Sequence, residues 1–344
     1  MSAADPLLQV LLESAIPFAL PLRRRFRGID LREGMLVKGP NGWGEFAPFD
    51  DYSDAAASRW LDSAIEAAFG EWPAALRSSV EVNAIIPALE SGDAATLARE
   101  AVLDNGCRTI KVKVGADLAD DEARVASVRD VLNTTLGRGN GAIRIDANGA
   151  WDVRRAALSL RRLGAYGLEY VEQPCSTVEE LRELRGQTDV PIAVDETIRT
   201  SVDPQGVRVR EFADLAIVKP APLGGVGSTL RVVEALDVPV IVSGSLDSSV
   251  GLDVALAVAA ALSDLPFACG FGTGALLAAD VVGVSRVPLD GRLPVQRTMP
   301  DLPALLAARD RLSDERAAWW RGRLIDAWAA GARERSSWLV SHAS

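Results

Sequence analysis

Histidine is almost absent from this sequence, which has a single one, His342, near the end of its 344 residues. A Ser-His-Asp triad, a Cys-His pair and a histidine-ligated zinc site are therefore disfavoured. Any acid–base chemistry must come from carboxylates, lysines, tyrosines or cysteines. Any metal site must be built from oxygen ligands, which favours magnesium, calcium or manganese.

Cysteine is also scarce, and the three residues present are far apart in the chain: Cys107, Cys175 and Cys269. They form no CxxC pair, so neither a disulfide framework nor a zinc site is indicated, which fits a reducing cytosol. The first residues lack the basic start and cleavage site of a signal peptide. No apolar run approaches the ~20 residues of a membrane span, so we expect a cytoplasmic protein without membrane contact.

Positive charge is in deficit, since the formal net charge is -10. Phosphate contacts dominate affinity for nucleic acid, so an acidic chain of this kind is not expected to bind it. The one basic cluster, Arg23 to Arg25 with Arg27, is short and typical of a solvated loop. We expect a small-molecule substrate; the sequence leaves the oligomeric state open, and a monomer is compatible with it.

The first 82 residues show no repeating rhythm of strands and helices and are predicted to form a small α+β domain. Strands are expected at Leu7–Leu12 and Gly34–Lys38, because both are short apolar runs. The segment Ile16–Asp30 contains Pro17, Pro21 and Gly28 and is expected to be a loop. Ser53 is expected to cap a helix that extends to about Phe69.

From residue 83 to about 285, apolar strand patterns alternate with helical ones. This alternation predicts a parallel sheet, and eight strands in about 200 residues predict a (β/α)8 barrel of the TIM type. Residues 286–344 are expected to pack back on the barrel or on the N-terminal domain. The expected strands are VEVNAIIPA from about Glu81, Thr109–Val114, Ala142–Ala147, Leu168–Glu172, Pro191–Asp195, Leu215–Lys219, Pro239–Ser243 and Phe267–Phe271.

Two lysines, Lys111 and Lys113, stand two residues apart in the second of these strands. Side chains on a strand alternate between its faces, so both ammonium groups should lie on one face. Such crowding can lower a lysine pKa towards neutrality, as a proton-abstracting base requires. The alternative is an exposed edge strand that carries two solvated lysines.

Charged residues also end the next four strands, where the active sites of such barrels lie. Each has an ordinary structural alternative, because the acids could cap helices or end turns and the lysine could be solvated, but their convergence favours a site. The three acids would form an oxygen cage suited to Mg²⁺. Glu196, which directly follows Asp195, should face away from this cage because side chains alternate along a strand. A metal-held carboxylate acidifies the neighbouring C–H, and a lysine on either side could act on it. These residues are Asp146, Glu172, Asp195 and Lys219.

The motifs KVK, DAN, EQP and DE, followed by the strand-six lysine, resemble the enolase superfamily and its muconate-lactonising-enzyme-like subgroup. The resemblance spans the chain and implies an N-terminal capping domain that closes the barrel mouth. It also implies a lysine base working with Mg²⁺, for which Mn²⁺ could substitute. By position, Lys113 matches the base, Lys111 a residue that tunes it, and Lys219 the opposite lysine. The implied metal ligands are Asp146, Glu172 and Asp195.

Within that subgroup the chain is most similar to the o-succinylbenzoate synthase family of actinobacterial type. The similarity rests on NAIIPA, RIDANGAW, SGSLDSSVGL and GFGTGALLAADV. It implies dehydration of 2-succinyl-6-hydroxy-2,4-cyclohexadiene-1-carboxylate to 2-succinylbenzoate in menaquinone biosynthesis. Arg144, Ser243 and Ser245 resemble positions near the substrate; the alternatives are a surface arginine and turn serines.

Other activities of the superfamily remain open, namely N-succinylamino-acid racemisation, dipeptide epimerisation and muconate cycloisomerisation. A racemase would use both Lys113 and Lys219 as bases. Dipeptide epimerases carry an Asp-x-Asp motif on strand eight, and CGFGTG here has no acid, which counts against that activity. A catalytically silent barrel that binds a metabolite is the non-enzymatic alternative. We also hypothesise that one arginine of Arg23 to Arg25 meets a succinyl carboxylate.

Overall fold

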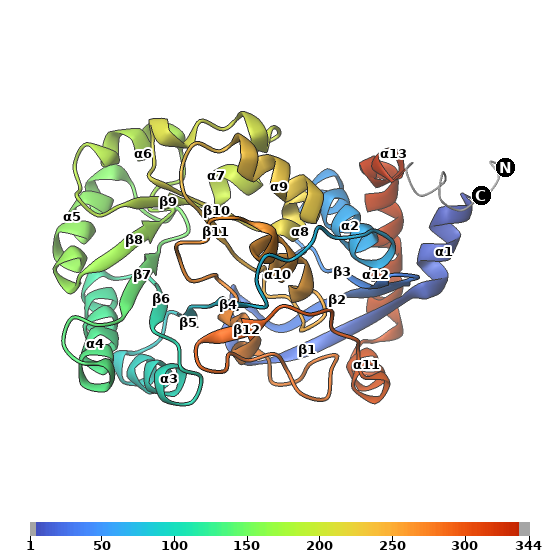
Figure 1. Ribbon diagram of the computed structural model, residues 1–344, viewed down its shortest axis with the longest axis horizontal. Coiled ribbons are helices and arrows are strands. Elements are labelled where there is room, and N and C mark those ends of the chain that lie inside the picture. Colours follow the sequence, from blue (N-terminus) through green and yellow to red (C-terminus); the bar gives the residue numbers. More distant parts are fainter. Residues whose placement is uncertain (1–4, 337–344) are drawn as a thin grey trace.

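A computed structural model describes residues 5–336 and shows a capping domain beside a barrel (Figure 1). The capping domain contains an antiparallel sheet in the order β1-β2-β3, formed by Ala15–Phe26, Ile29–Gly39 and Gly42–Phe46. The helix α2 (Asp54–Phe69) packs against this sheet. The Ser53 hydroxyl accepts a hydrogen bond from the Ala56 N–H at 3.3 Å, which confirms the predicted cap.

Two predictions for the capping domain are wrong. Residues 7–12 lie in a helix, α1 (Pro6–Ser14), because Asp5 caps its first turn and Pro6 is pre-organised at the first helical position. The expected loop at 16–30 is largely the long strand β1, which pairs with β2 from Ala15 to Pro21. β1 is an edge strand, and an edge tolerates proline because only one of its sides must supply hydrogen bonds.

The barrel sheet is parallel and confirms the predicted TIM-type fold. Its strands follow the order β11-β10-β9-β8-β7-β6-β5. The ring is closed by residues 269 and 270, because Ser243 bridges to Gly270 and Cys269 bridges to Val82. The expected eighth strand is therefore reduced to isolated bridges. From β5 to β11, the strands are Ala84–Ile86, Thr109–Lys113, Ala142–Asp146, Leu168–Glu172, Ile192–Val194, Leu215–Val218 and Val240–Val242.

The expected first strand is split in the structure. Its start, β4 (Ser79–Glu81), pairs antiparallel with β12 (Arg292–Pro294) outside the barrel sheet. Helices follow most of the strands, as the predicted alternation of strands and helices requires. Between β9 and β10, the region 204–212 forms two 3₁₀ turns, Pro204–Gly206 and Val209–Glu211. The barrel helices are α3 (Ser91–Leu103), α4 (Leu118–Leu136), α5 (Val153–Leu163), α6 (Val178–Arg185), α7 (Glu196–Arg199), α8 (Pro220–Leu223), α9 (Val226–Ala235) and α10 (Leu252–Ala261).

The C-terminal helices return to the capping domain. They are α11 (Leu302–Arg309), α12 (Asp314–Ala327) and α13 (Arg333–Arg335), and α12 packs on α2 (Figure 1). Trp320 of α12 is 1% exposed, and its ring meets that of Phe46 edge-on at 6.1 Å between centroids. The single histidine, His342, lies outside the described residues. Within residues 5–336 we find no helix with the length and apolarity needed to cross a bilayer.

Candidate active site

The strand register places the predicted charged residues in two layers inside the barrel. Lys111 of β6 pairs with Arg144 of β7, and one layer higher Lys113 pairs with Asp146. Asp146 in turn pairs with Glu172 of β8. Alternating side chains on neighbouring parallel strands therefore carry Lys113, Asp146 and Glu172 to the same end of the sheet.

The two lysines of β6 are held by carboxylates rather than solvent. Lys111 is 6% exposed, and its Nζ lies 3.0 Å from Glu172 Oε2 and 3.6 Å from Asp146 Oδ2. The Lys113 Nζ donates to Asp146 Oδ2 at 2.5 Å and to Asn148 Oδ1 at 2.6 Å. Because β6 lies between β5 and β7, the alternative of a solvated edge strand is wrong.

The pKa of Lys111 is raised, whereas crowding of the two lysines was expected to lower it. Burial alone would lower the pKa of Lys111, but the charges of Glu172 and Asp146 outweigh burial and raise it above its ordinary value. Crowding by Lys113 therefore does not neutralise this group. Lys111 is a fixed positive charge beneath the carboxylates.

Lys219 lies at the end of β10 and faces the site from another strand. Its Nζ donates to Asp195 Oδ2 at 2.5 Å, so the solvated alternative for this lysine is also wrong. Asp195 Oδ1 accepts from Arg199 Nε at 3.1 Å. Glu196 begins α7 instead of continuing the strand, and it binds the same Arg199 at 2.7 Å. Both neighbouring acids thus contact one guanidinium.

Neither Asp146 nor Asp195 caps the helix that follows it, so the helix-capping alternative is wrong for both. The helix after β7 is capped by Asp152, and Asp146 instead accepts the Asn148 N–H at 3.0 Å. The Asp195 side chain makes no capping hydrogen bond to α7. These carboxylates are therefore directed into the barrel mouth.

Three carboxylates with at most 1% exposure lie close enough to affect one another: Asp146, Glu172 and Asp195. Burial and the charge of Asp146 raise the pKa of Glu172 to about 7. For Asp146, burial opposes ionisation, but the charges of Lys113 and Lys111 outweigh it and lower its pKa. These carboxylates repel one another, and their oxygen atoms are the type of ligand that a divalent cation such as Mg²⁺ prefers. Within residues 5–336, however, no three His, Cys, Asp or Glu side chains are already arranged to hold one ion together.

Backbone strain is concentrated around this site. Among the described non-glycine residues, five have positive φ, and three of them line the hollow at the barrel mouth: Arg27, Asn148 and Leu246. A fourth, Gln173, follows Glu172 and accepts the Asp195 N–H at 3.1 Å. Such conformations persist only where the surrounding structure enforces them, and they cluster at functional sites.

Of the three residues expected near the substrate, two line the hollow at the barrel mouth and one does not. Ser243 and Ser245 line the hollow, which measures about 40 Å³. Arg144 is fully buried one layer below it, so the surface alternative for this residue is wrong. Its guanidinium binds Glu169, Asn83 and the Ala268 carbonyl. Arg144 therefore does not line the hollow.

Sequence reasoning missed several residues at the mouth. Asn148 bonds Lys113, and Arg199 bonds Asp195; Phe26 and Arg27 reach the hollow from the capping domain. Asn148 could have been found in the DAN motif, whose third residue follows the strand-end Asp146. Nothing local to Phe26 and Arg27 reveals their position, because the β1–β2 pairing that carries them was not predicted.

Comparisons with known proteins agree with this arrangement. Residues 93–303 match the family described as Enolase C-terminal domain-like, and residues 18–68 match that described as Enolase N-terminal domain-like. The chain belongs to the enolase superfamily. Members of this superfamily use a divalent metal.

Curated relatives of this enolase-superfamily chain share nearly half of its residues. An o-succinylbenzoate synthase of Thermobifida fusca is 48% identical over 312 residues, which cover 88% of this chain and 96% of the relative. An o-succinylbenzoate synthase of Mycolicibacterium smegmatis is 47% identical over 329 residues, which cover 94% and 98%.

Solved structures of the superfamily support the fold alone. A muconate cycloisomerase variant has a TM-score of 0.69 at 21% identity and covers 89% of this chain and 98% of its own. The N-succinyl Arg/Lys racemase of Bacillus cereus has a TM-score of 0.70 at 17% identity, with coverage of 86% and 96%. Since both differ in activity, fold similarity does not choose the reaction.

Proposed function

We propose that this chain is an o-succinylbenzoate synthase, a hydro-lyase of menaquinone biosynthesis. The reaction dehydrates 2-succinyl-6-hydroxy-2,4-cyclohexadiene-1-carboxylate to 2-succinylbenzoate. The observation that carries the proposal is the 46–48% identity to curated o-succinylbenzoate synthases over most of the chain. The paired lysines and acids at the barrel mouth supply the chemistry that this reaction needs.

Lys113 is the base in this proposal. Its Nζ lies at the barrel mouth beside Asp146 and borders the hollow. The neutral amine removes the proton from the ring carbon that bears the carboxylate. The resulting ammonium returns that proton to the departing hydroxyl, so that one water leaves and the ring becomes aromatic. The hydrogen bond from Lys113 Nζ to Asn148 Oδ1 at 2.6 Å supports this position of the amine.

Lys219 and Lys111 act by their charge. Lys219 borders the hollow from β10 and stabilises the negative charge that develops after proton removal. Lys111 lies below, bonded to Glu172, where it orients that carboxylate. A racemase would instead need Lys113 and Lys219 as alternating bases.

Asp146, Glu172 and Asp195 are the residues that would hold Mg²⁺, with Mn²⁺ as a substitute. A metal held there would supply positive charge beside the substrate carboxylate, which would favour loss of the neighbouring proton. The ammonium groups of Lys113 and Lys219 contact oxygens of Asp146 and Asp195 in the structure, so metal binding requires those two contacts to rearrange.

Turnover of the hydroxycyclohexadiene carboxylate tests the proposal, measured with and without Mg²⁺. Wild type should require the metal, and Lys113→Ala should lose about 10²- to 10⁴-fold in kcat, the usual contribution of a general base. Lys38→Ala is the matched control, because Lys38 is an exposed lysine of the capping domain. A wild type inert on this compound but active in N-succinylamino-acid racemisation would overturn the assignment. A fully active Lys113→Ala would overturn the role of the base.

A further inference from the structure

Arg27 occupies a turn that does not suit arginine. The β1–β2 hairpin closes through Arg27 and Gly28 alone, because Phe26 pairs with Ile29. Both turn residues have positive φ, 50° and 78°. Two-residue hairpin turns of this kind favour Asn-Gly, because at positive φ the Cβ atom crowds the following carbonyl oxygen, glycine has no Cβ, and asparagine can offset the strain with a local hydrogen bond. Arginine at this strained position calls for a functional explanation.

The side chain of Arg27 has no acidic partner among the described residues. Its neighbours in the basic cluster do, because Arg24 pairs with Asp93 at 3.0 Å and Arg25 pairs with Asp30 at 3.7 Å. The guanidinium of Arg27 instead lies 4.3 Å from the centroid of the Phe49 ring. Cation–π contact holds the group in place without neutralising its charge.

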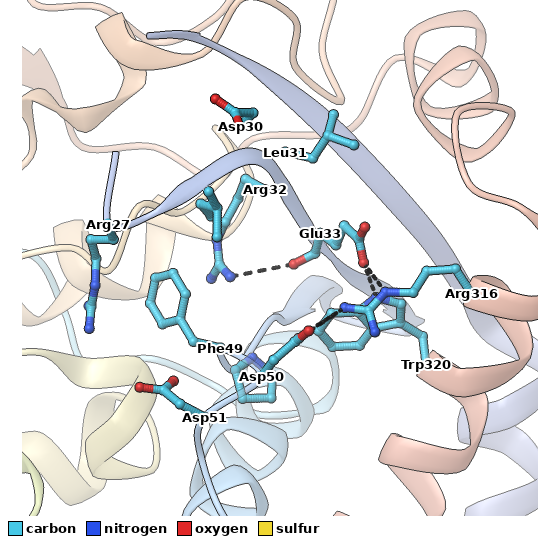
Figure 2. A pocket seen from close by; sticks show the side chains of 12 residues that line it. Arg27, Asp30, Leu31, Arg32, Glu33, Phe49, Asp50, Asp51, Arg316 and Trp320 are labelled. Carbon is cyan, nitrogen blue, oxygen red and sulfur yellow. Dashed lines mark hydrogen bonds and ion pairs between the residues drawn. The ribbon is translucent and has the colours of Figure 1, made fainter. Parts of the chain in front are cut away.

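A second arginine secures the ring that supports Arg27. The Arg32 guanidinium also lies 4.3 Å from the Phe49 centroid, and Figure 2 shows the ring between the two arginines. Arg32 is 2% exposed and donates to backbone carbonyls of Leu246 and Ala47. Arg32 and Phe49 therefore form a fixed support, whereas Arg27 is exposed.

The position of this free cation matches a substrate with two carboxylates. Arg27 lines both the catalytic hollow and the adjoining cavity of about 600 Å³ drawn in Figure 2. In the hollow, the three lysines are each paired with a buried carboxylate. Arg27, by contrast, contacts an aromatic ring and no acid among the described residues, so its charge is available to an incoming anion.

We propose that Arg27 is a specificity-determining residue that binds the succinyl carboxylate of the substrate. This inference rests on the proposed function, which supplies a substrate whose second carboxylate lies on a flexible arm away from the reacting carbon. It replaces the hypothesis for Arg23 to Arg25, because Arg24 and Arg25 are paired and none of the three lines the hollow. A guanidinium can bind that carboxylate through two parallel hydrogen bonds.

The variant Arg27→Asn tests the inference, because asparagine suits this turn and removes the charge. With the cyclohexadiene substrate, KM should rise about 10- to 100-fold, the usual effect of losing a charged hydrogen bond, while kcat changes little. Arg25→Asn is the matched control, since it lies in the same hairpin outside the hollow. An unchanged KM in Arg27→Asn would overturn the inference.

Calorimetry on the Mg²⁺-loaded protein provides a readout independent of turnover. Wild type should bind 2-succinylbenzoate at least 10-fold more tightly than its analogue in which a carboxamide replaces the succinyl carboxylate. Arg27→Asn should bind both compounds alike; a retained preference for the dicarboxylate would refute the role of Arg27. A wild type that turns over no cyclohexadiene substrate would refute the proposed function instead, which separates the two failures.

Discussion

Glu45 gives the protein a specific dependence of stability on pH. This residue of β3 is 6% exposed, and its Oε2 accepts the Ser248 N–H of the barrel loop at 3.0 Å. Its Oε1 is buried without a hydrogen-bond partner. Burial and the charge of Asp247 raise the pKa of Glu45 from its ordinary value of 4.5 to about 7, against the opposing charge of Arg32.

The sign of the effect follows from this raised pKa. The folded protein binds the proton of Glu45 more tightly than the unfolded chain, so its contribution to stability is complete below pH 4.5 and is lost as the pH rises through 7. One pKa unit corresponds to about 1.4 kcal/mol. Between pH 5 and 7.5, Glu45 should therefore reduce the free energy of unfolding by on the order of 2–3 kcal/mol.

Glu45→Gln isolates this contribution, because glutamine keeps an oxygen for the Ser248 N–H but does not ionise. Urea unfolding of wild type and variant at pH 5, 6, 7 and 8, with EDTA present to exclude metal binding, measures it. Wild type should lose stability relative to the variant across this range. Parallel pH profiles would refute the reasoning. Asp247→Asn should move the wild-type loss to lower pH, because it removes the neighbouring charge.

Other perturbations give separate tests. Without metal, Lys111→Met should lower the free energy of unfolding by about 3–5 kcal/mol, because it leaves Glu172 buried beside Asp146 without its partner; chemical denaturation measures this. Mg²⁺ should raise the melting temperature of wild type and raise it less in Asp195→Asn, and equal shifts would contradict the ligand assignment. Trp320→Ala should cost about 3–5 kcal/mol by opening a cavity beside Phe46, whereas a loss under 1 kcal/mol would contradict the packing.

The charged residues at the barrel mouth could be predicted because strand geometry fixes their place. Parallel strands end at one edge and side chains alternate, so Lys113, Asp146 and Glu172 had to meet once their strands were aligned. The composition adds a further signal: the chain contains four lysines, three of them in this site. All the remaining ion pairs within residues 5–336 are made by arginine, for example the pair of Arg286 with Asp253.

The capping domain was less predictable because its elements depend on long-range contacts. Residues 7–12 form a short apolar run whose period does not distinguish a strand from a helix, and capping by Asp5 decides it. β1 carries prolines that signal a loop, yet pairing with β2 and burial of Phe18 and Leu20 make it a strand. Because β1 was not predicted, the position of Arg27 at the barrel mouth could not be predicted either.

The packing of α12 against α2 has a consequence for biosynthesis. The cluster that holds the capping domain joins Leu11 of α1 and Trp60 of α2 to Trp320 and Leu324 of α12, residues from opposite ends of the chain. During translation the barrel strands leave the ribosome before α12 does, and domains generally fold as their residues emerge. The capping domain can therefore be completed only after α12 has been synthesised. A chain that stops before α12 would carry every lysine and acid of the site and still lack the finished cover that holds Arg27 over it.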